Sequence, residues 1–148
     1  MGRWHDLFLL ATEPYRNYGS FSGRARQRDY FLFIAFQWLV IVCIAILHRV
    51  LTGGARLPDP EQGLHGSLPD QLAVAATLLF ILASIVPWLA VSTRRLHDRG
   101  YRGWIMVRWF LPYVGLLFML WDLLRAGDRG PNAFGPDPRG VNFDDWFE

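Results

Sequence analysis

Hydrophobic positions are concentrated in three long runs that short polar segments separate. These runs cover residues 30–51, 72–92 and 104–124. At about 1.5 Å per residue, an α-helix of about 20 residues crosses the ~30 Å hydrocarbon core of a bilayer. The first two runs have no polar face at the helical period, although a surface helix of a soluble protein needs one. The pattern predicts an all-α membrane protein with about three transmembrane helices.

The third run is chemically mixed. Arg108 lies near its start and Asp122 near its end, so it crosses the membrane only if these two residues lie at opposite interfaces. Pro112, Tyr113, Val114 and Gly115 interrupt its middle. The sequence therefore leaves open an alternative, in which the run turns back at these residues as a re-entrant hairpin.

The remaining segments complete a single membrane domain. In the N-terminal segment 1–29, apolar residues at helical spacing predict a short helix that lies in the membrane interface and stops before Pro14. An irregular loop is expected over 52–71 and an arginine-rich loop over 93–103. The tail, residues 125–148, is rich in Gly, Pro, Asp and Asn, which predicts irregular structure.

Composition agrees with a membrane location and narrows the chemistry. Hydrophobic residues make up 52% of the chain and charged residues 19%, against about 25% charged in soluble domains. The net charge of +2 is too small to favour nucleic acid as a partner. Cys43 is the single cysteine, which excludes an intrachain disulfide or a cysteine-based metal site, and the four histidines have no ligand spacing. We expect no cofactor and no metal.

The distribution of arginines predicts the orientation. Nine of them lie in segments 1–29 and 93–103. Five others are Arg49 at the end of the first run, Arg56 in the loop 52–71, and three arginines in the tail. Basic loops stay in the cytoplasm. With three spans, the bias predicts a cytoplasmic N-terminus and an exported C-terminus.

Three polar stretches contain the candidate functional residues. Before the first run, Arg24, Arg26 and Arg28 alternate with other residues; they are suited to contact anionic lipid phosphates, or they serve only as a topology signal. After the second run, Asp98 lies among four arginines, which predicts an internal counter-charge in a folded, ion-paired loop. His97 adjoins Asp98, and neighbours on a helix point about 100° apart, which argues against a catalytic pair.

The third stretch, residues 130–138, contains three prolines and two glycines. Its turn-forming residues predict a defined loop that Phe134 helps to dock. Across the three stretches and the start of the third run, the candidate residues for lipid binding, partner binding or structure are Arg24, Arg26, Arg28, Arg94, Arg95, His97, Asp98, Gly100, Trp104, Arg108, Asn132, Phe134, Gly135 and Asp137.

These stretches, in this order, resemble the bacterial inner-membrane family called domain of unknown function 805. The resemblance extends over about residues 21–138 and rests on Gly-Arg-Ala-Arg, Arg-Arg-Leu-His-Asp-x-Gly and Asn-x-Phe-Gly-Pro-Asp-Pro. The chain departs from the family pattern at Asp29, Phe31, Arg102, Ile105 and Ala133; the last stands where a basic residue is common, which weighs against anion binding by the tail. The resemblance implies an inner-membrane location and a helical fold, and it implies no activity.

Two function classes follow. The distinctive residues are in loops and the runs contain almost no polar groups, which favours a non-catalytic protein that acts through helix packing with partner proteins, as a homo-oligomer, or through anionic lipid. The alternative is a small oligomeric transporter or channel subunit, with Arg108 as the ionisable residue that would mark a path. An enzyme is not expected, because no catalytic constellation is apparent.

Overall fold

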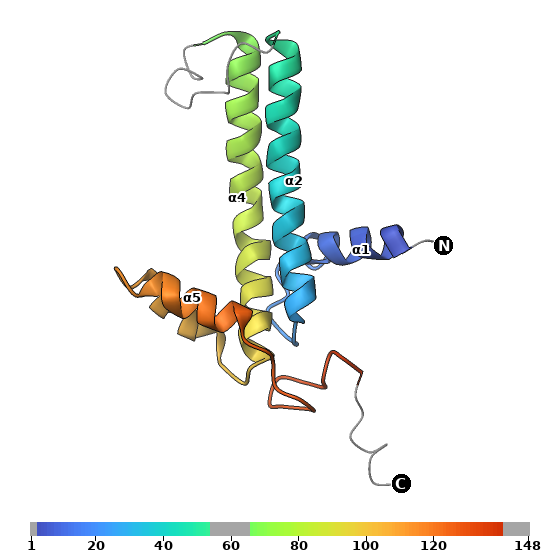
Figure 1. Ribbon diagram of the computed structural model, residues 1–148, viewed down its shortest axis with the longest axis vertical. Helices are drawn as coiled ribbons and strands as arrows, with labels where there is room; N and C mark the ends of the chain where they lie inside the picture. The colour runs from blue at the N-terminus through green and yellow to red at the C-terminus, as the bar shows by residue number, and fades with distance from the viewer. Residues whose placement is uncertain (1–2, 54–65, 141–148) are drawn as a thin grey trace. The chain divides into compact units, whose positions relative to one another are not determined.

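The computed structural model describes residues 3–53 and 66–140 (Figure 1). Within these ranges the chain is helical and contains no named strand; an isolated bridge joins Asn132 and Gly135. The described elements are α1 (Arg3–Arg16), α2 (Gln27–Leu51), α4 (Leu68–His97), the 3₁₀-helix η1 (Gly103–Phe110) and α5 (Gly115–Leu124).

Two helices are long and apolar enough to cross a membrane. They are α2, with 25 residues, and α4, with 30 residues, and these lengths correspond to about 37 and 45 Å. Only 11% of the apolar stretch of α2 and 22% of that of α4 is buried, whereas a core helix of a soluble protein is mostly buried. The first two predicted runs therefore form helices whose apolar surface is largely uncovered by protein.

The first part of the loop expected over 93–103 is helical, and this prediction is corrected. Helix α4 continues to His97, so Arg94 and Arg95 lie on its last turn. After the last helical residue, the chain turns away at Gly100, whose φ is +72°. The N–H groups of Gly100 and Tyr101 donate to the carbonyls of His97 and Leu96, both at 3.0 Å. This is the Schellman pattern, in which glycine takes the left-handed position.

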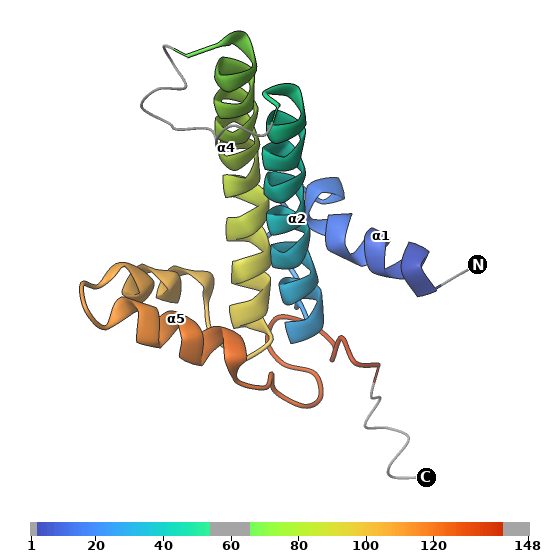
Figure 2. The ribbon, with the colours of Figure 1, turned by 45° about the horizontal axis from the view of Figure 1, so that its top comes forward.

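The prediction of one continuous helix over 104–124 is wrong. This stretch forms η1, a turn and α5, and the two helices lie side by side (Figure 2). Their lengths, 8 and 10 residues, correspond to only about 15 Å each, half of a hydrocarbon core. The chain reverses at Pro112 to Gly115, with Tyr113 at φ +67°. We call residues 103–124 the hairpin.

Gly115 is required at the base of this turn. A Cβ at this position would overlap the backbone carbonyl of Trp109, so only glycine allows α5 to approach η1 so closely. The turn at Pro112 to Gly115, left open as the alternative by the sequence, is therefore the conformation that the backbone adopts.

The N-terminal segment contains the helix α1, which continues through Pro14 to Arg16, so the predicted end before Pro14 is wrong. Its location in a membrane interface stays a prediction.

The chain divides into two compact units. One comprises Ile34–Ile85, where α2 and α4 run side by side (Figures 1 and 2). In it, buried His48 lies 2.6 Å from Asp70 through its Nε2 atom, and the backbone N–H of Ser67 donates to the same carboxylate. The other unit comprises Met1–Phe33 and Val86–Glu148. It contains all three polar stretches and the hairpin.

Candidate functional site

Asp98 is the centre of a buried ionic cluster. Its carboxylate is fully buried and accepts hydrogen bonds from Arg24 Nε at 3.0 Å and Arg95 Nη1 at 2.8 Å, with Arg139 Nη2 at 3.4 Å. A buried carboxylate needs such partners, because burial without them is costly. The three arginines come from the segment before α2, from the end of α4 and from the tail. Asp98 therefore joins three segments that are distant in the sequence.

Arg24 extends this cluster into the tail. Its Nη1 atom donates to the carbonyl of Gly130 and its Nη2 atom to that of Asp128, both at 2.6 Å. The backbone N–H of Asp128 donates in turn to the carbonyl of Asp98 at 2.7 Å. The planar guanidinium has five donors, and Arg24 uses them on protein groups. It is therefore not available to lipid phosphates in this structure.

The tail docks on the end of α4. Asn132 donates from Nδ2 to the carbonyl of His97 at 2.9 Å, and the ring of Phe134 stacks on the His97 imidazole, with centroids 4.0 Å apart. His97 Nδ1 lies 3.1 Å from the carbonyl of Gly23, so this nitrogen carries the proton. Gly135, at φ +134°, closes the turn. His97 is thus occupied on its ring face and on one nitrogen.

Asp137 holds the tail loop closed. Its carboxylate accepts from the backbone N–H groups of Gly130 at 3.0 Å and Arg139 at 2.9 Å. Burial raises the pKa of Asp137, but these hydrogen bonds and the charges of Arg139 and Arg24 outweigh it, and the pKa lies below its ordinary value. Asp137 is therefore ionised at neutral pH. We call residues 22–26, 94–100 and 126–139 together the cap.

Arg94 ties α1 to the cap. It forms a bidentate pair with Glu13, at 2.8 and 2.9 Å, and its carbonyl accepts from the N–H of Ala25 at 3.0 Å. Burial raises the pKa of Glu13, but the hydrogen bonds from Arg94 and Asn17 and the charge of Arg94 outweigh this effect. The pKa of Glu13 therefore lies below its ordinary value.

A second ionic cluster holds the hairpin. Asp122 is fully buried and accepts from Arg99 Nη1 at 2.8 Å, from Trp109 Nε1 at 2.7 Å and from Arg108. Arg95 joins the two clusters, since its Nη2 atom donates to the carbonyl of Arg125, just after α5. The turn at 112–115 brings Arg108 and Asp122 together, although a single helix would hold them at opposite ends.

The structure thus sorts the candidate residues into two groups. Arg26 and Arg28 are at least partly exposed beside a small cavity, and Trp104 is exposed. The other eleven candidates take part in the contacts that hold the cap together or in its ionic clusters: Arg24, Arg94, Arg95, His97, Asp98, Gly100, Arg108, Asn132, Phe134, Gly135 and Asp137.

Sequence reasoning missed four partners: Glu13, Arg99, Trp109 and Arg139. Charge was a usable signal for Glu13, which is one of few acidic residues before α2, but nothing local distinguishes Arg139. Over the described ranges, no group of three or more His, Cys, Asp or Glu residues is arranged to hold a metal ion.

The amino-acid sequence of the chain matches a known protein family. The family model described as "Protein of unknown function (DUF805)" matches residues 18–136. Two relatives from Escherichia coli (strain K12), "Inner membrane protein YhaH" and "Inner membrane protein YhaI", are each 32% identical over 124 residues. The match covers 84% of this chain and 91% and 90% of the relatives.

No solved structure matches the chain. The matched range contains both long apolar helices and most of the cap, including the Asp98 cluster apart from Arg139. On the extent of the family match and the similarity to both relatives, this chain belongs to the DUF805 family of bacterial membrane proteins.

Proposed function

We propose that this chain is a non-catalytic protein of the bacterial inner membrane that acts at the cytoplasmic face, where its cap holds the hairpin in one leaflet against anionic lipid. The observation that carries the proposal is the convergence of three separate segments on buried Asp98. Residues that contact one another across the cap lie on one side of a membrane, so α2 and α4 are the only full crossings in this proposal.

The arginine distribution supports a cytoplasmic cap. With two crossings, twelve of the fifteen arginines lie on the side of the cap and two on the other side, counting segments 1–29, 93–103 and 125–148 together. This is a stronger bias than three crossings produce, and basic loops stay in the cytoplasm. The predicted exported C-terminus rested on a third crossing; this proposal instead puts it in the cytoplasm.

The hairpin has the surface of a segment that enters lipid. Its outward side chains are large and apolar, and its ionic groups face inward onto Asp122. Polar groups in hydrocarbon must be satisfied within the protein, and this cluster meets that condition. With arms of about 15 Å, the hairpin reaches only the middle of the bilayer. These features support a re-entrant segment in the inner leaflet.

A catalytic role gains no support from the adjacent His97 and Asp98. His97 is stacked on Phe134, and Asp98 is fully buried and enclosed by arginines, so the two side chains are engaged separately in contacts of the cap. The transporter alternative gains no support either, because Arg108, its candidate ionisable residue, is paired with Asp122.

The depth of the hairpin tip tests the proposal. Tyr113 is 100% exposed, so Tyr113→Cys in a Cys43→Ala background tolerates labelling without disturbing the fold. In inside-out and right-side-out vesicles, a membrane-impermeant maleimide is expected to label it from neither side, because the tip lies in hydrocarbon. Ser22→Cys, an exposed position in the cap, is the control and is expected to label from the cytoplasmic side only.

Two outcomes contradict the proposal. Labelling of Arg129→Cys, an exposed position after the hairpin, from the exported side means that the stretch crosses the membrane, because a crossing segment also protects Tyr113→Cys at its middle. Labelling from the cytoplasmic side, at the rate of Ser22→Cys, means that the hairpin lies in water.

A further inference from the structure

We propose that the cap and the hairpin together bind one anionic phospholipid. The phosphate lies in a cavity lined by arginines beside the start of α2, and an acyl chain lies along the outer face of α5. This inference rests on the proposed function, because it needs both surfaces at the cytoplasmic interface of the membrane.

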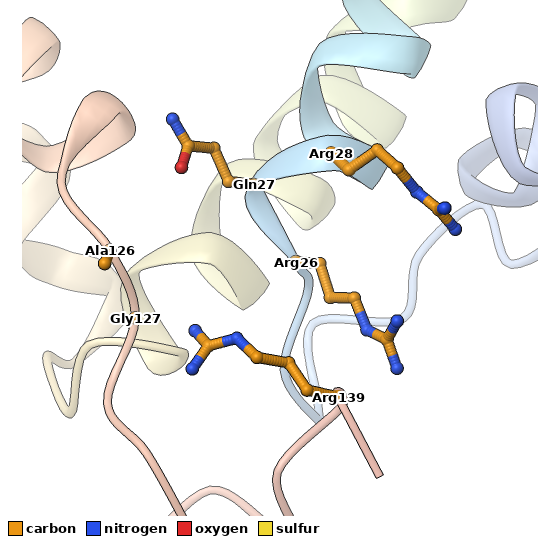
Figure 3. Close-up of a pocket in the computed structure, with 6 residues that line it drawn as sticks. All are labelled: Arg26, Gln27, Arg28, Ala126, Gly127 and Arg139. Atoms are coloured by element: carbon orange, nitrogen blue, oxygen red, sulfur yellow. The ribbon is translucent and has the colours of Figure 1, made fainter. Parts of the chain in front are cut away.

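The first surface is a cationic cavity of about 370 Å³. It is lined by Arg26, Gln27, Arg28, Ala126, Gly127 and Arg139, and none of these residues is acidic (Figure 3). Such basic pockets at the cytoplasmic side of membrane helices suit lipid headgroups.

The three arginines of this cavity are weakly engaged by the protein. Within the described part of the chain, Arg26 forms no ion pair, and Arg28 Nε lies 3.6 Å from its neighbour Asp29. Arg139 lies 3.4 Å from Asp98 and 3.8 Å from Asp137. By contrast, Arg24 and Arg95 make hydrogen bonds of 2.6 to 3.0 Å in the cap. A phosphate would supply closer charge-assisted acceptors than the carboxylates that Arg28 and Arg139 reach here.

The side chains are free to adjust to such a ligand. Figure 3 shows Arg139 extending toward Gly127, whereas Arg26 and Arg28 extend the opposite way from the start of α2. The Arg28 side chain is 60% exposed, so no packing opposes its rotation toward a phosphate. The backbone of the cavity, in contrast, is fixed by the cap.

The second surface is an apolar groove with a cation at its end. The groove, about 550 Å³ in volume, is lined by Leu117, Leu120, Trp121, Leu124 and Arg125. The Arg125 guanidinium carbon lies 4.9 Å from the centroid of the Trp121 ring. Tryptophan and arginine at the end of an apolar surface are typical of a membrane interface. The groove therefore fits an acyl chain whose polar end lies near Arg125.

The two surfaces adjoin each other where α5 ends and the tail begins. Gln27 Nε2 donates to the carbonyl of Leu124 at 3.1 Å, which ties the start of α2 to the end of α5. Leu124 ends the groove and Gly127 borders the cavity; three residues span at most about 11 Å. Arg95 fixes the intervening carbonyl of Arg125. A free phosphate would fill only the cavity, whereas a phospholipid would occupy both surfaces.

The test measures lipid retention by the full chain in a neutral detergent, using native mass spectrometry and added phosphatidylglycerol. Arg26→Gln with Arg28→Gln is expected to weaken retention roughly fivefold per arginine, about 25-fold in all. Arg102→Gln with Arg129→Gln removes the same charge from exposed positions outside both surfaces, and is expected to change retention less than about twofold. Equal losses in the two double variants overturn the site, because they indicate a general charge effect.

The groove is tested on the same helix. Leu117, in the groove, is 66% exposed, and Leu116, outside it, is 62% exposed, so neither change disturbs a packed core. Leu117→Gln is expected to weaken retention several-fold and Leu116→Gln to leave it unchanged. Glycerol phosphate is the competitor that separates the two sources of phosphate. If it displaces the lipid at equal concentration, the site is one for a soluble phosphate and the lipid assignment is overturned.

These outcomes separate this inference from the proposed function. If Tyr113→Cys is protected from both sides but the site and control variants retain lipid equally, only the lipid site fails. If Tyr113→Cys is labelled from either side, the membrane placement fails first.

Discussion

At the scale of single residues, Asp98 shows how a buried charge specifies a structure. Its carboxylate is balanced by arginines from three segments. Removing one partner of a buried ionic group leaves a charge without compensation, which costs about 3–5 kcal/mol. The cap is therefore held by specific geometry around one side chain rather than by general attraction between arginines and acids.

Gly127 is the residue whose substitution tests this geometry most directly. A Cβ at Gly127 would overlap the Asp98 carboxylate, which Arg24 and Arg95 prevent from moving away. Gly127→Ala is expected to destabilise the protein by about 1–3 kcal/mol, the usual cost of overpacking. The thermal unfolding midpoint of the full chain in detergent, followed by circular dichroism, measures the loss.

Gly19→Ala is the matched control, since a Cβ at Gly19 meets no atom within 4 Å. An unfolding midpoint for Gly127→Ala equal to that of the control would show that Asp98 is not confined as described.

At the scale of elements, α1 depends on an ion pair that lies at its end. Glu13, near the C-terminus of α1, pairs with Arg94 on α4, and this pairing lowers the pKa of Glu13 below its ordinary value of 4.5. A carboxyl group whose folded-state pKa is lowered stabilises the fold above its unfolded pKa, and the contribution is lost as the pH falls through the folded value.

The stability of the protein is therefore expected to fall below about pH 4.5. Asp137, with a lowered pKa as well, adds to the same loss. Unfolding midpoints measured between pH 7 and pH 3 check this. Glu13→Gln should lower the midpoint at pH 7 and reduce its dependence on pH; a variant with the wild-type pH profile would exclude a role for this pair.

The sequence predicts elements unequally well, for physical reasons. The runs at 30–51 and 72–92 predict α2 and α4 because an unbroken apolar surface of that length has few alternatives to a spanning helix. The hairpin is harder to predict from the sequence, because Arg108 and Asp122 are as compatible with opposite membrane interfaces as with an ion pair between them. Gly115 decides between these, through its close approach to Trp109, and that contact is visible only in three dimensions.

Prediction of the candidate site was limited in the same way. The sequence identifies Asp98 as a counter-charge within its own loop, but two of its three arginines, Arg24 and Arg139, come from distant segments. Pairing over such separations depends on which side of the membrane each segment lies, and the assumption of three spans separated the tail from the loop. The predicted three spans therefore assigned to opposite sides two segments that the structure brings together.

At the scale of the whole molecule, the two crossings that we propose put both ends of the chain on one side of the membrane. A C-terminal fusion to a reporter that is active only in the cytoplasm is expected to be active, and one that requires export is expected to be inactive. N-terminal fusions should give the same result, because the twelve arginines on that side favour the cytoplasm. Activity of the exported reporter at the C-terminus would restore a third crossing.

The link between Asp98 and the tail also has a consequence for biosynthesis. Residues 128–139 leave the ribosome after both long helices, so Asp98 acquires its last partner, Arg139, only when those helices have reached the bilayer. The cap can then close only if the start of α2, the end of α4 and the tail have been delivered to the same compartment. A chain inserted with one of these segments on the other side would leave Asp98 without part of its arginine contacts.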